Sequence, residues 1–241
     1  MKKGMTMRAV RLGVASLMVS LTAAGFAGLV CANAAHAEVA AADPIDAAMR
    51  ACLARADRSS TAGQVQCMDE ARNAWRAAAD AALGRVIAKL PPAQQKRWQL
   101  SQKTWASWRD IEDAMLAAAF ATTSGSSYQL YAADMRLQPV RDRALALRSV
   151  VAAAAGADAP RARPCSDDAL CEHATYDLER YYRKLYARMP AHARPVLARA
   201  QAAWRTYRDA TTPLMDERAR LDLLGARLAT LKRLSETVGN R

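Results

Sequence analysis

The sequence predicts an all-α fold of two tandem helical modules with short-range disulfides. Alanine and arginine dominate the 241 residues, and Gly and Pro are sparse. The runs of β-branched and aromatic residues that strands favour are missing. One motif of proline, glutamine, aromatic residues, arginine and aspartate occurs twice in a single register, at an offset of 99 residues. Such a match indicates two copies of one helical unit.

Residues 1–37 have the layout of a secretory signal peptide. A basic start with four cations precedes an uncharged, mostly apolar run from Leu12 to Val30, and Ala35-His36-Ala37 is a small-residue cleavage site. We therefore expect a periplasmic or secreted protein, cleaved after Ala37. Two alternatives stay open, because the apolar run is long enough to remain as an anchor and Cys31 could carry a lipid.

The chain after residue 37 is basic, and we expect no transmembrane segment in it. Cleavage removes four of the 35 cations and none of the 23 acids, so the formal charge falls from +12 to +8. This balance suits anionic envelope polymers or lipid head groups. Nucleic acid is not expected as a partner, since no motif that reads it is present.

The first module is predicted at residues 43–155. A glycine- and serine-containing stretch, a proline pair and a Ser/Gly-rich turn divide it. The divisions predict a short helix from about Ile45 to Ala56, a long helix over 64–90, a motif helix over 93–120, a turn at 122–127 and a fourth helix over 128–151.

Residues 156–164 form the predicted linker, because proline and glycine punctuate a stretch without large apolar residues. The second module is predicted at 165–238. Its first helix covers about 167–189, a motif helix follows Pro190 and ends or kinks at Thr211-Thr212-Pro213, and the last helix covers 214–237.

The repeated motif places an aromatic stripe, an amide and a guanidinium on one helix face. Successive residues of a helix turn by about 100°, so the glutamine, both aromatic residues and the arginine share an arc of roughly 120°. Such a face is either a buried stripe that contains polar groups or a binding surface. We favour the buried stripe. The copies read Gln102, Trp105, Trp108, Arg109 and Asp110 after Pro91, and Gln201, Trp204, Tyr207, Arg208 and Asp209 after Pro190.

Each motif arginine needs a carboxylate if it is buried on an aromatic face. Antiparallel hairpins at the two prolines predict that Arg109 pairs with Glu70 or Asp69, and Arg208 with Glu172 or Asp177. The hairpins also predict that most aromatic residues are core, namely Trp75, Trp98, Trp105 and Trp108 in the first module and Tyr176, Tyr182, Tyr186, Trp204 and Tyr207 in the second.

Four cysteines remain after cleavage: Cys52, Cys67, Cys165 and Cys171. An even number in an exported chain favours disulfides, and four cysteines allow three pairings. The repeat favours Cys52–Cys67 and Cys165–Cys171, since each pair then precedes its own motif.

Catalysis finds little support in the sequence, where nothing marks a carboxylate pair for glycoside cleavage, and we expect no catalytic residue, cofactor or metal. No P-loop, G-x-S-x-G or G-x-G-x-x-G sequence is present. His173 beside Glu172 and four residues before Asp177 lacks the second histidine of a metal motif. His173 is interpreted as a surface residue, and His192, between Pro190 and Pro195, as solvent-exposed.

At its motifs the chain resembles the lysozyme inhibitor LprI-like family of small exported helical proteins. The Gln-x-x-Trp-x-x-Tyr-Arg-Asp pattern stands almost in full in the second copy, and the first has Trp108 for the tyrosine and Ser124-Gly125-Ser126 at the loop. The further cysteines common in the family are absent. The resemblance implies binding or inhibition of a cell-wall hydrolase such as lysozyme.

Charge complicates that implication, because lysozymes of the animal type are basic and a +8 chain is repelled at long range. An acidic patch at Glu112-Asp113 or Asp167-Asp168 is one way to enter a basic enzyme's cleft. The alternative function is an envelope module that binds anionic cell-wall or membrane material through a basic surface. Its cations are Arg180, Arg183, Lys184, Arg188, Arg194, Arg199 and Arg205.

Overall fold

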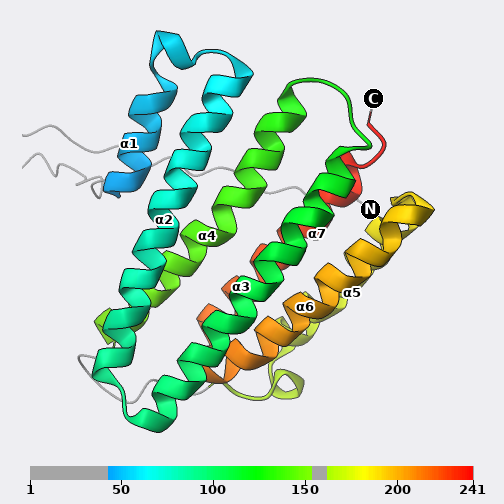
Figure 1. The fold of residues 1–241 in the computed structure, drawn as a ribbon. Coiled ribbons are helices and arrows are strands. Elements are labelled where there is room, and N and C mark those ends of the chain that lie inside the picture. Colours follow the sequence, from blue (N-terminus) through cyan, green and yellow to red (C-terminus); the bar gives the residue numbers. More distant parts are fainter. Residues whose placement is uncertain (1–42, 154–161, 241) are drawn as a thin grey trace, which may run out of the picture. The chain divides into compact units, whose positions relative to one another are not determined.

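The computed structural model describes residues 43–153 and 162–240, and every element in them is helical (Figure 1). The predicted signal peptide and residues 156–161 of the predicted linker lie outside this part. None of the described helices is long and apolar enough to cross a membrane. The α-helices are α1 (Pro44–Leu53), α2 (Thr61–Lys89), α3 (Pro92–Phe120), α4 (Ser127–Ala153), α5 (Ala169–Arg188), α6 (Arg194–Thr211) and α7 (Glu217–Thr237). Short 3-10 turns occur at Ala56–Arg58, Cys165–Asp167, Ala191–Ala193 and Thr212–Leu214.

Helix α2 begins at Thr61, three residues before the predicted start, because Ser60 caps it. The Ser60 hydroxyl accepts a hydrogen bond from the Gly63 amide at 3.1 Å, which satisfies one of the free donors of the first turn. A Cβ at Gly63 would lie 2.8 Å from backbone atoms of Arg58. The glycine therefore lets the 3-10 turn at Ala56–Arg58 pack directly against the start of α2.

Prolines end the helices where the sequence predicts. Helix α2 stops at Lys89 before the Pro91-Pro92 pair, and Pro92 occupies the first turn of α3, where its missing N–H costs nothing. Helix α6 ends at Thr211, two residues before Pro213. The predicted all-α fold is confirmed.

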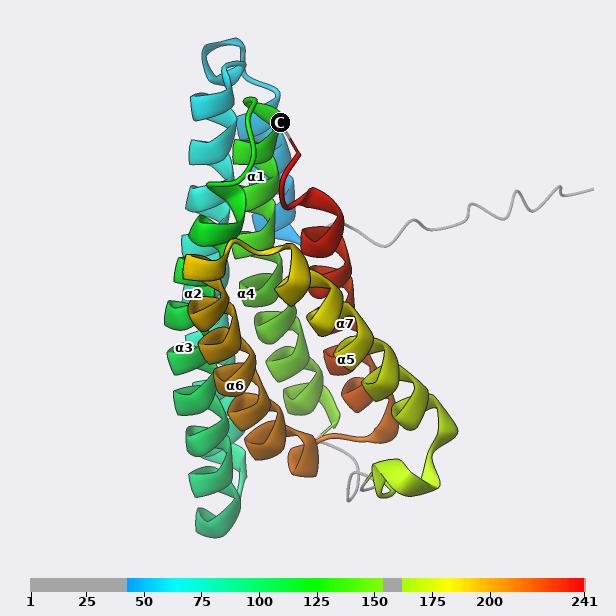
Figure 2. The ribbon, with the colours of Figure 1, turned by 90° about the vertical axis from the view of Figure 1, so that its right-hand side faces the viewer.

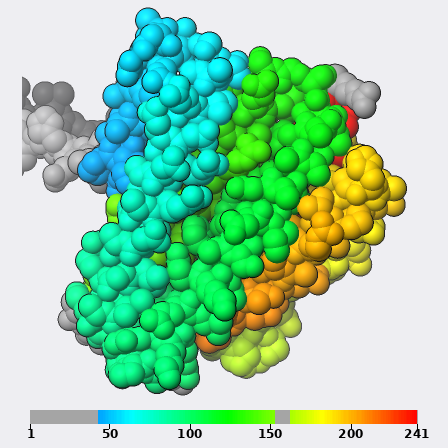
Figure 3. Space-filling view, in the orientation of Figure 1, coloured from blue at the N-terminus to red at the C-terminus, as the bar shows by residue number. Residues whose placement is uncertain are grey.

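The helices pack in three main pairs, one of which crosses the predicted module boundary. Helix α2 packs along α4, α5 packs along α7, and the two motif helices α3 and α6 pack along each other (Figures 1 and 2). Helix α1 covers one end of α2. On the face shown in Figure 3, α3 runs between α2 and α6. The division into two modules stays a prediction, but the motif helix of each predicted copy has its main neighbour in the other.

The predicted core is confirmed for the first copy and partly wrong for the second. All four tryptophans of the first copy are buried, as are Trp204 and Tyr207 of the second. Tyr176 is 61% exposed, Tyr186 is exposed and Tyr182 is half-buried. These tyrosines lie on the outer face of α5, since α5 turns Leu178 and Leu185 towards α7 instead.

Both favoured disulfides are present. Cys52 and Cys67 join the end of α1 to α2, and Cys165 and Cys171 close a loop of six residues at the start of α5. The bonds therefore hold the entrance to the first long helix of each predicted copy.

Candidate functional site

The motif residues lie mainly on the interface between α3 and α6. Trp105, Trp108 and Arg109 of α3 are buried there, as are Gln201, Trp204 and Tyr207 of α6. Gln102 and Arg208 are half-buried, and Asp110 and Asp209 are exposed. The aspartates thus stand outside the buried arc, as the helical spacing predicts for Asp110.

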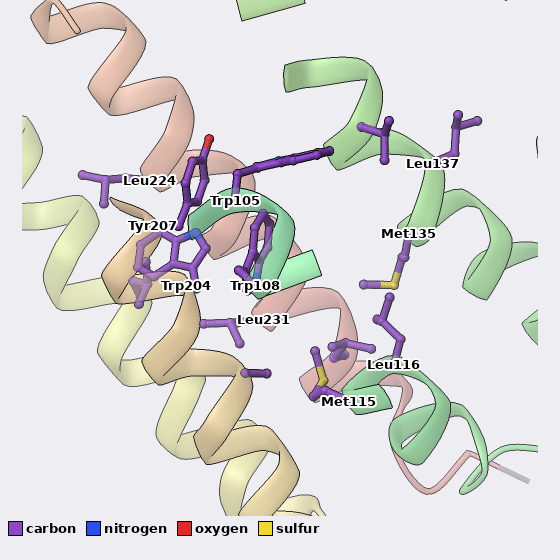
Figure 4. Close-up of a cluster of buried hydrophobic side chains, with 14 of the residues drawn as sticks. Trp105, Trp108, Met115, Leu116, Met135, Leu137, Trp204, Tyr207, Leu224 and Leu231 are labelled. Atoms are coloured by element: carbon purple, nitrogen blue, oxygen red, sulfur yellow. The ribbon is translucent and has the colours of Figure 1, made fainter. Parts of the chain in front are cut away.

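Trp108 and Tyr207 stack on each other at the centre of this interface. Their ring centroids are 5.4 Å apart and their planes differ by 4°. The two residues hold the same motif position in the two predicted copies, 99 residues apart. Figure 4 shows Trp108 of α3 beside Trp204 and Tyr207 of α6, with Leu224 and Leu231 of α7 next to them.

Arg227 of α7 binds one end of this aromatic cluster through Gln201 and Glu112, while its Nη2 has no hydrogen-bond partner among the described residues. Its Nε donates to Gln201 at 3.0 Å, and its Nη1 donates to the Glu112 carboxylate at 2.5 Å. The Trp108 indole donates to the other oxygen of Glu112 at 3.1 Å. Both members of the ion pair are buried, with 2% of Arg227 and 1% of Glu112 exposed. The carboxylate therefore neutralises a guanidinium that water does not reach.

Arg143 of α4 occupies the corresponding place in the first copy. Its Nε donates to Gln102 at 3.1 Å, and its Nη2 donates to the Ser101 hydroxyl at 3.1 Å. Its guanidinium lies 5.7 Å from the centroid of the Tyr207 ring. Each predicted copy thus has an arginine on its last helix that bonds the motif glutamine of its own copy. The same arginine lies over the second motif aromatic residue of the other copy, Arg143 over Tyr207 and Arg227 over Trp108.

Burial shifts the ionisation of this group and its neighbour. Only 3% of Arg143 is exposed, and burial lowers the pKa of its guanidinium. Burial also raises the pKa of the Tyr207 hydroxyl, which therefore stays protonated near neutral pH. Desolvation is thus the dominant influence at this end of the cluster.

A groove opens between α4 and α7 above the aromatic cluster. Its volume is about 1190 Å³, and Trp105, Trp108, Trp204 and Tyr207 line it together with Arg143 and Arg227. The groove exists because α4 packs on α2 and α7 packs on α5, so these two helices scarcely touch each other. It is the candidate binding site that the geometry offers.

The predicted partners of the motif arginines are wrong. Arg109 binds Asp113 on its own helix at 2.9 Å, and Arg208 binds the adjacent Asp209 at 2.8 Å. Glu70 lies instead beside Arg58, and Asp69 beside Arg72. Asp177 in turn lies beside His173 and Arg180. The hairpin argument failed because α2 packs along α4, and α5 along α7, rather than each along its motif helix.

Burial also distinguishes the two motif arginines. Arg109 is buried over the Trp108 ring, and burial lowers its pKa while Glu112 and Asp113 act in the opposite direction. Arg208 lies over Trp204 with 27% of its side chain exposed. Both arginine side chains pack at the α3–α6 interface, and that of Arg109 is the less exposed of the two.

Each acidic pair expected to enter a partner's cleft has one buried member. Glu112 is buried against Arg227, and Asp168 is buried as the N-cap of α5, where it binds Arg220 at 2.7 Å. Asp113 pairs with Arg109 but keeps 43% of its side chain exposed, and Asp167 is exposed. Glu112 and Asp168 therefore stabilise the fold, and Asp113 and Asp167 are the members of these pairs that a partner can reach.

The outer face of α5 and α6 carries cations beside tyrosine rings. Arg194 lies 5.4 Å from the Tyr186 centroid and Arg205 lies 6.0 Å from that of Tyr182. Arg180 and Lys184 flank Tyr181 in the same way. His173 is largely exposed, and no group of three potential metal ligands occurs in the described ranges.

One family model matches part of the chain. Residues 52–147 match the model described as lysozyme inhibitor LprI. This part of the chain is similar to the LprI family. The match covers the first copy of the motif and ends before the second, so it does not test the predicted duplication. No curated protein matches the chain.

A solved structure shares the fold of this chain. It is the crystal structure of an uncharacterised protein from Burkholderia thailandensis, with 54% sequence identity and a TM-score of 0.79. The match covers 83% of this chain and 100% of the other. Both predicted copies therefore lie largely within a fold that occurs in a second protein.

Proposed function

We propose that this chain is an exported binding protein that inhibits a lysozyme-type cell-wall hydrolase. The observation that carries the proposal is the family match over residues 52–147, whose name denotes lysozyme inhibition. The two disulfides fit export, since such bonds persist in oxidising compartments. We place the protein in the periplasm or outside the cell after cleavage at Ala37, with inhibition rather than catalysis as its role.

The Ser124–Ser127 loop is the proposed contact with the enzyme. Its four residues are exposed, and Gly125 has a φ of 109°, a conformation that favours glycine. The backbone around it is held by the C-terminal residues, because the Ser124 amide donates to Asn240 at 3.3 Å and the Gly239 amide donates to Thr122 at 3.0 Å. A loop fixed in this way loses little conformational entropy on binding.

The composition of the loop suits a basic partner better than the rest of the chain does. No charged side chain occurs from Ala114 to Ala133, whereas the chain as a whole has a formal charge of +12. Small serine and glycine side chains also allow the backbone to approach a narrow cleft closely. The loop therefore offers hydrogen-bonding groups without adding to the repulsion between two basic proteins.

A cell-lysis assay with the purified chain from residue 38 tests the proposal. We expect micromolar protein to slow lysis by a lysozyme, and the double substitution Ser124→Arg with Ser126→Arg to weaken inhibition at least tenfold. Gln94→Arg is the matched control, since Gln94 is exposed at the opposite end of α3 and gains the same side chain. Undiminished lysis with the unsubstituted protein would contradict the proposal.

The surface of α5 and α6 favours a second candidate function, the binding of anionic envelope material. Exposed Arg183 and Lys184 extend the row of cations and tyrosines described above. This function predicts salt-sensitive sedimentation with an anionic cell-wall preparation. Replacing Arg183 and Lys184 by serine should then release the protein, and retention of such a variant at low salt would eliminate this candidate.

A further inference from the structure

Arg143 is a buried guanidinium without a carboxylate partner in the described part of the chain. Its two hydrogen bonds go to the neutral groups of Gln102 and Ser101, and its Nη1 has no hydrogen-bond partner among the described residues. Burying a charge is costly unless an opposite charge or a full set of hydrogen bonds compensates it. Arg143 therefore has an unbonded Nη1 group and an uncompensated charge.

The second copy shows what is missing. Arg227 makes the same bond to a motif glutamine, and Glu112 supplies its counter-charge. The residue 99 positions after Glu112 is Thr211, whose hydroxyl bonds Ser101 at 2.7 Å beside Arg143. Arg227 thus has the carboxylate of Glu112 beside it, whereas the position that corresponds to Glu112 near Arg143 holds the hydroxyl of Thr211.

The uncompensated arginine belongs to the lining of a space that a ligand can enter. Arg143 lines the groove between α4 and α7 together with Trp105, Trp108, Trp204 and Tyr207. Aromatic residues beside a few polar groups are the usual lining of a small-molecule site. The groove therefore combines an aromatic lining with one buried cation, Arg143, that has no counter-charge among the described residues.

We propose that this groove binds a small organic acid with a single carboxylate and a flat, apolar body. The carboxylate pairs with the guanidinium of Arg143 and gives it the counter-charge that Glu112 gives Arg227. The body lies against the aromatic residues. A ligand with several negative charges is disfavoured, because apart from Arg143 and Arg227 the groove lining carries more acids than cations: Asp134, Asp142, Asp222 and Glu236 beside Lys232 and Arg233.

A pair of probes that differ in charge alone tests the proposal. The chain from residue 38 is titrated with 3-phenylpropionate and with 3-phenylpropionamide, in a buffer without organic acids. Binding is followed by calorimetry and by tryptophan fluorescence. We expect the acid to bind at least ten times more tightly than the amide. N-acetyl-alanyl-alanine in a parallel titration shows whether a peptide carboxyl terminus or a free organic acid fits better.

Two variants locate the site. Arg143→Met should remove the preference for the acid, and Gly225→Phe should block binding of the acid by filling the groove from α7. No atom lies within 4 Å of a Cβ built at Gly225, so this change leaves the core intact even if Arg143→Met impairs folding. Arg199→Met, at an exposed position of α6, is the matched control and should bind like the parent.

Three results would overturn the proposal: no binding of either carboxylate at millimolar concentration, equal binding of acid and amide, or undiminished binding of the acid by the Gly225→Phe protein. Any of them would mean that the groove does not select a carboxylate.

Discussion

Trp108 and Tyr207 lie face to face, with centroids 5.4 Å apart, although 99 residues separate them in the chain. Each is the second aromatic residue of its motif, and each lies under the arginine of the other copy's last helix, Arg227 or Arg143. The repeated motif therefore forms the contact between the two predicted copies. Its conserved spacing within this chain is explained by packing before any binding role is invoked.

Replacing Trp108 by alanine should destabilise the whole described fold, by about 3–5 kcal/mol for a buried large aromatic side chain. The ring contacts α6 and α7 as well as holding Glu112. In urea titrations followed by circular dichroism, we expect a single cooperative transition whose midpoint is lower than that of the parent. Trp108→Phe is the control with a smaller loss. Two separate transitions would show that the copies unfold independently.

Glu112→Gln should cost more than any substitution of an exposed acid. It leaves Arg227 charged and buried, a situation that costs about 3–5 kcal/mol when a buried pair loses one partner. The neighbouring Asp113→Asn removes an ion pair with 43% of the aspartate exposed, for which about 0–1 kcal/mol is expected. Similar urea midpoints for the two variants would refute the assigned role of Glu112.

The two motif arginines should differ in their effect on stability. Arg109→Ala removes a buried side chain that packs on Trp108, and we expect about 2 kcal/mol. Arg208→Ala should cost about 1 kcal/mol or less, because its ion pair with Asp209 is exposed. Arg109→Met keeps most of the packing and should recover stability. If the alanine variants keep their melting temperatures but lose a ligand, the motif is a binding site rather than a packing signature.

Asp46 should make stability depend on pH. Its carboxylate accepts from Arg141 at 2.7 Å and from the Trp75 indole at 3.3 Å, and the hydrogen bond from Arg141 holds its pKa below the ordinary 3.8. A lowered pKa contributes stability that is present above 3.8 and is lost as the pH falls through the folded-state value. The difference in melting temperature between the parent and Asp46→Asn should therefore be constant from pH 5 to 7 and shrink below about pH 4.

The Cys52–Cys67 disulfide should matter more than Cys165–Cys171. Their closed loops span 15 and 6 residues, which correspond to about 3 and 2 kcal/mol in the chain-entropy account. Paired serine substitutions and denaturant titration measure both values. A larger loss at Cys165–Cys171 would show that its position at the N-terminus of α5 outweighs loop length.

The helices, the proline boundaries and the burial of the motif follow from local pattern, and the sequence predicts them. The partners of Arg109 and Arg208 do not follow, because they depend on which helices become neighbours. The sequence predicts that α2 and α3, which a proline turn joins, pack together. In the structure α2 packs mainly along α4, and α3 packs mainly along α6. Periodicity alone carries no information on that choice.

Arg143 and Arg227 escaped prediction for a related reason. They are equivalent by contact, each bonded to a motif glutamine, but 84 residues separate them instead of 99. The shorter second copy shifts them out of register, so an alignment at the motif offset misses the pair. An arginine within an apolar helix stripe, such as Arg227 between Leu224 and Leu231, is the signal that could have found it.

The ion pair of Glu112 and Arg227 also constrains the order of folding. The two residues are 115 positions apart, and the carboxylate sits in the interior, beside the Trp108 indole. Until α7 docks, closing the core around α3 would trap an unpaired anion, which is unfavourable by several kcal/mol. Closure of the interior around Glu112 therefore has to accompany the docking of the last helix.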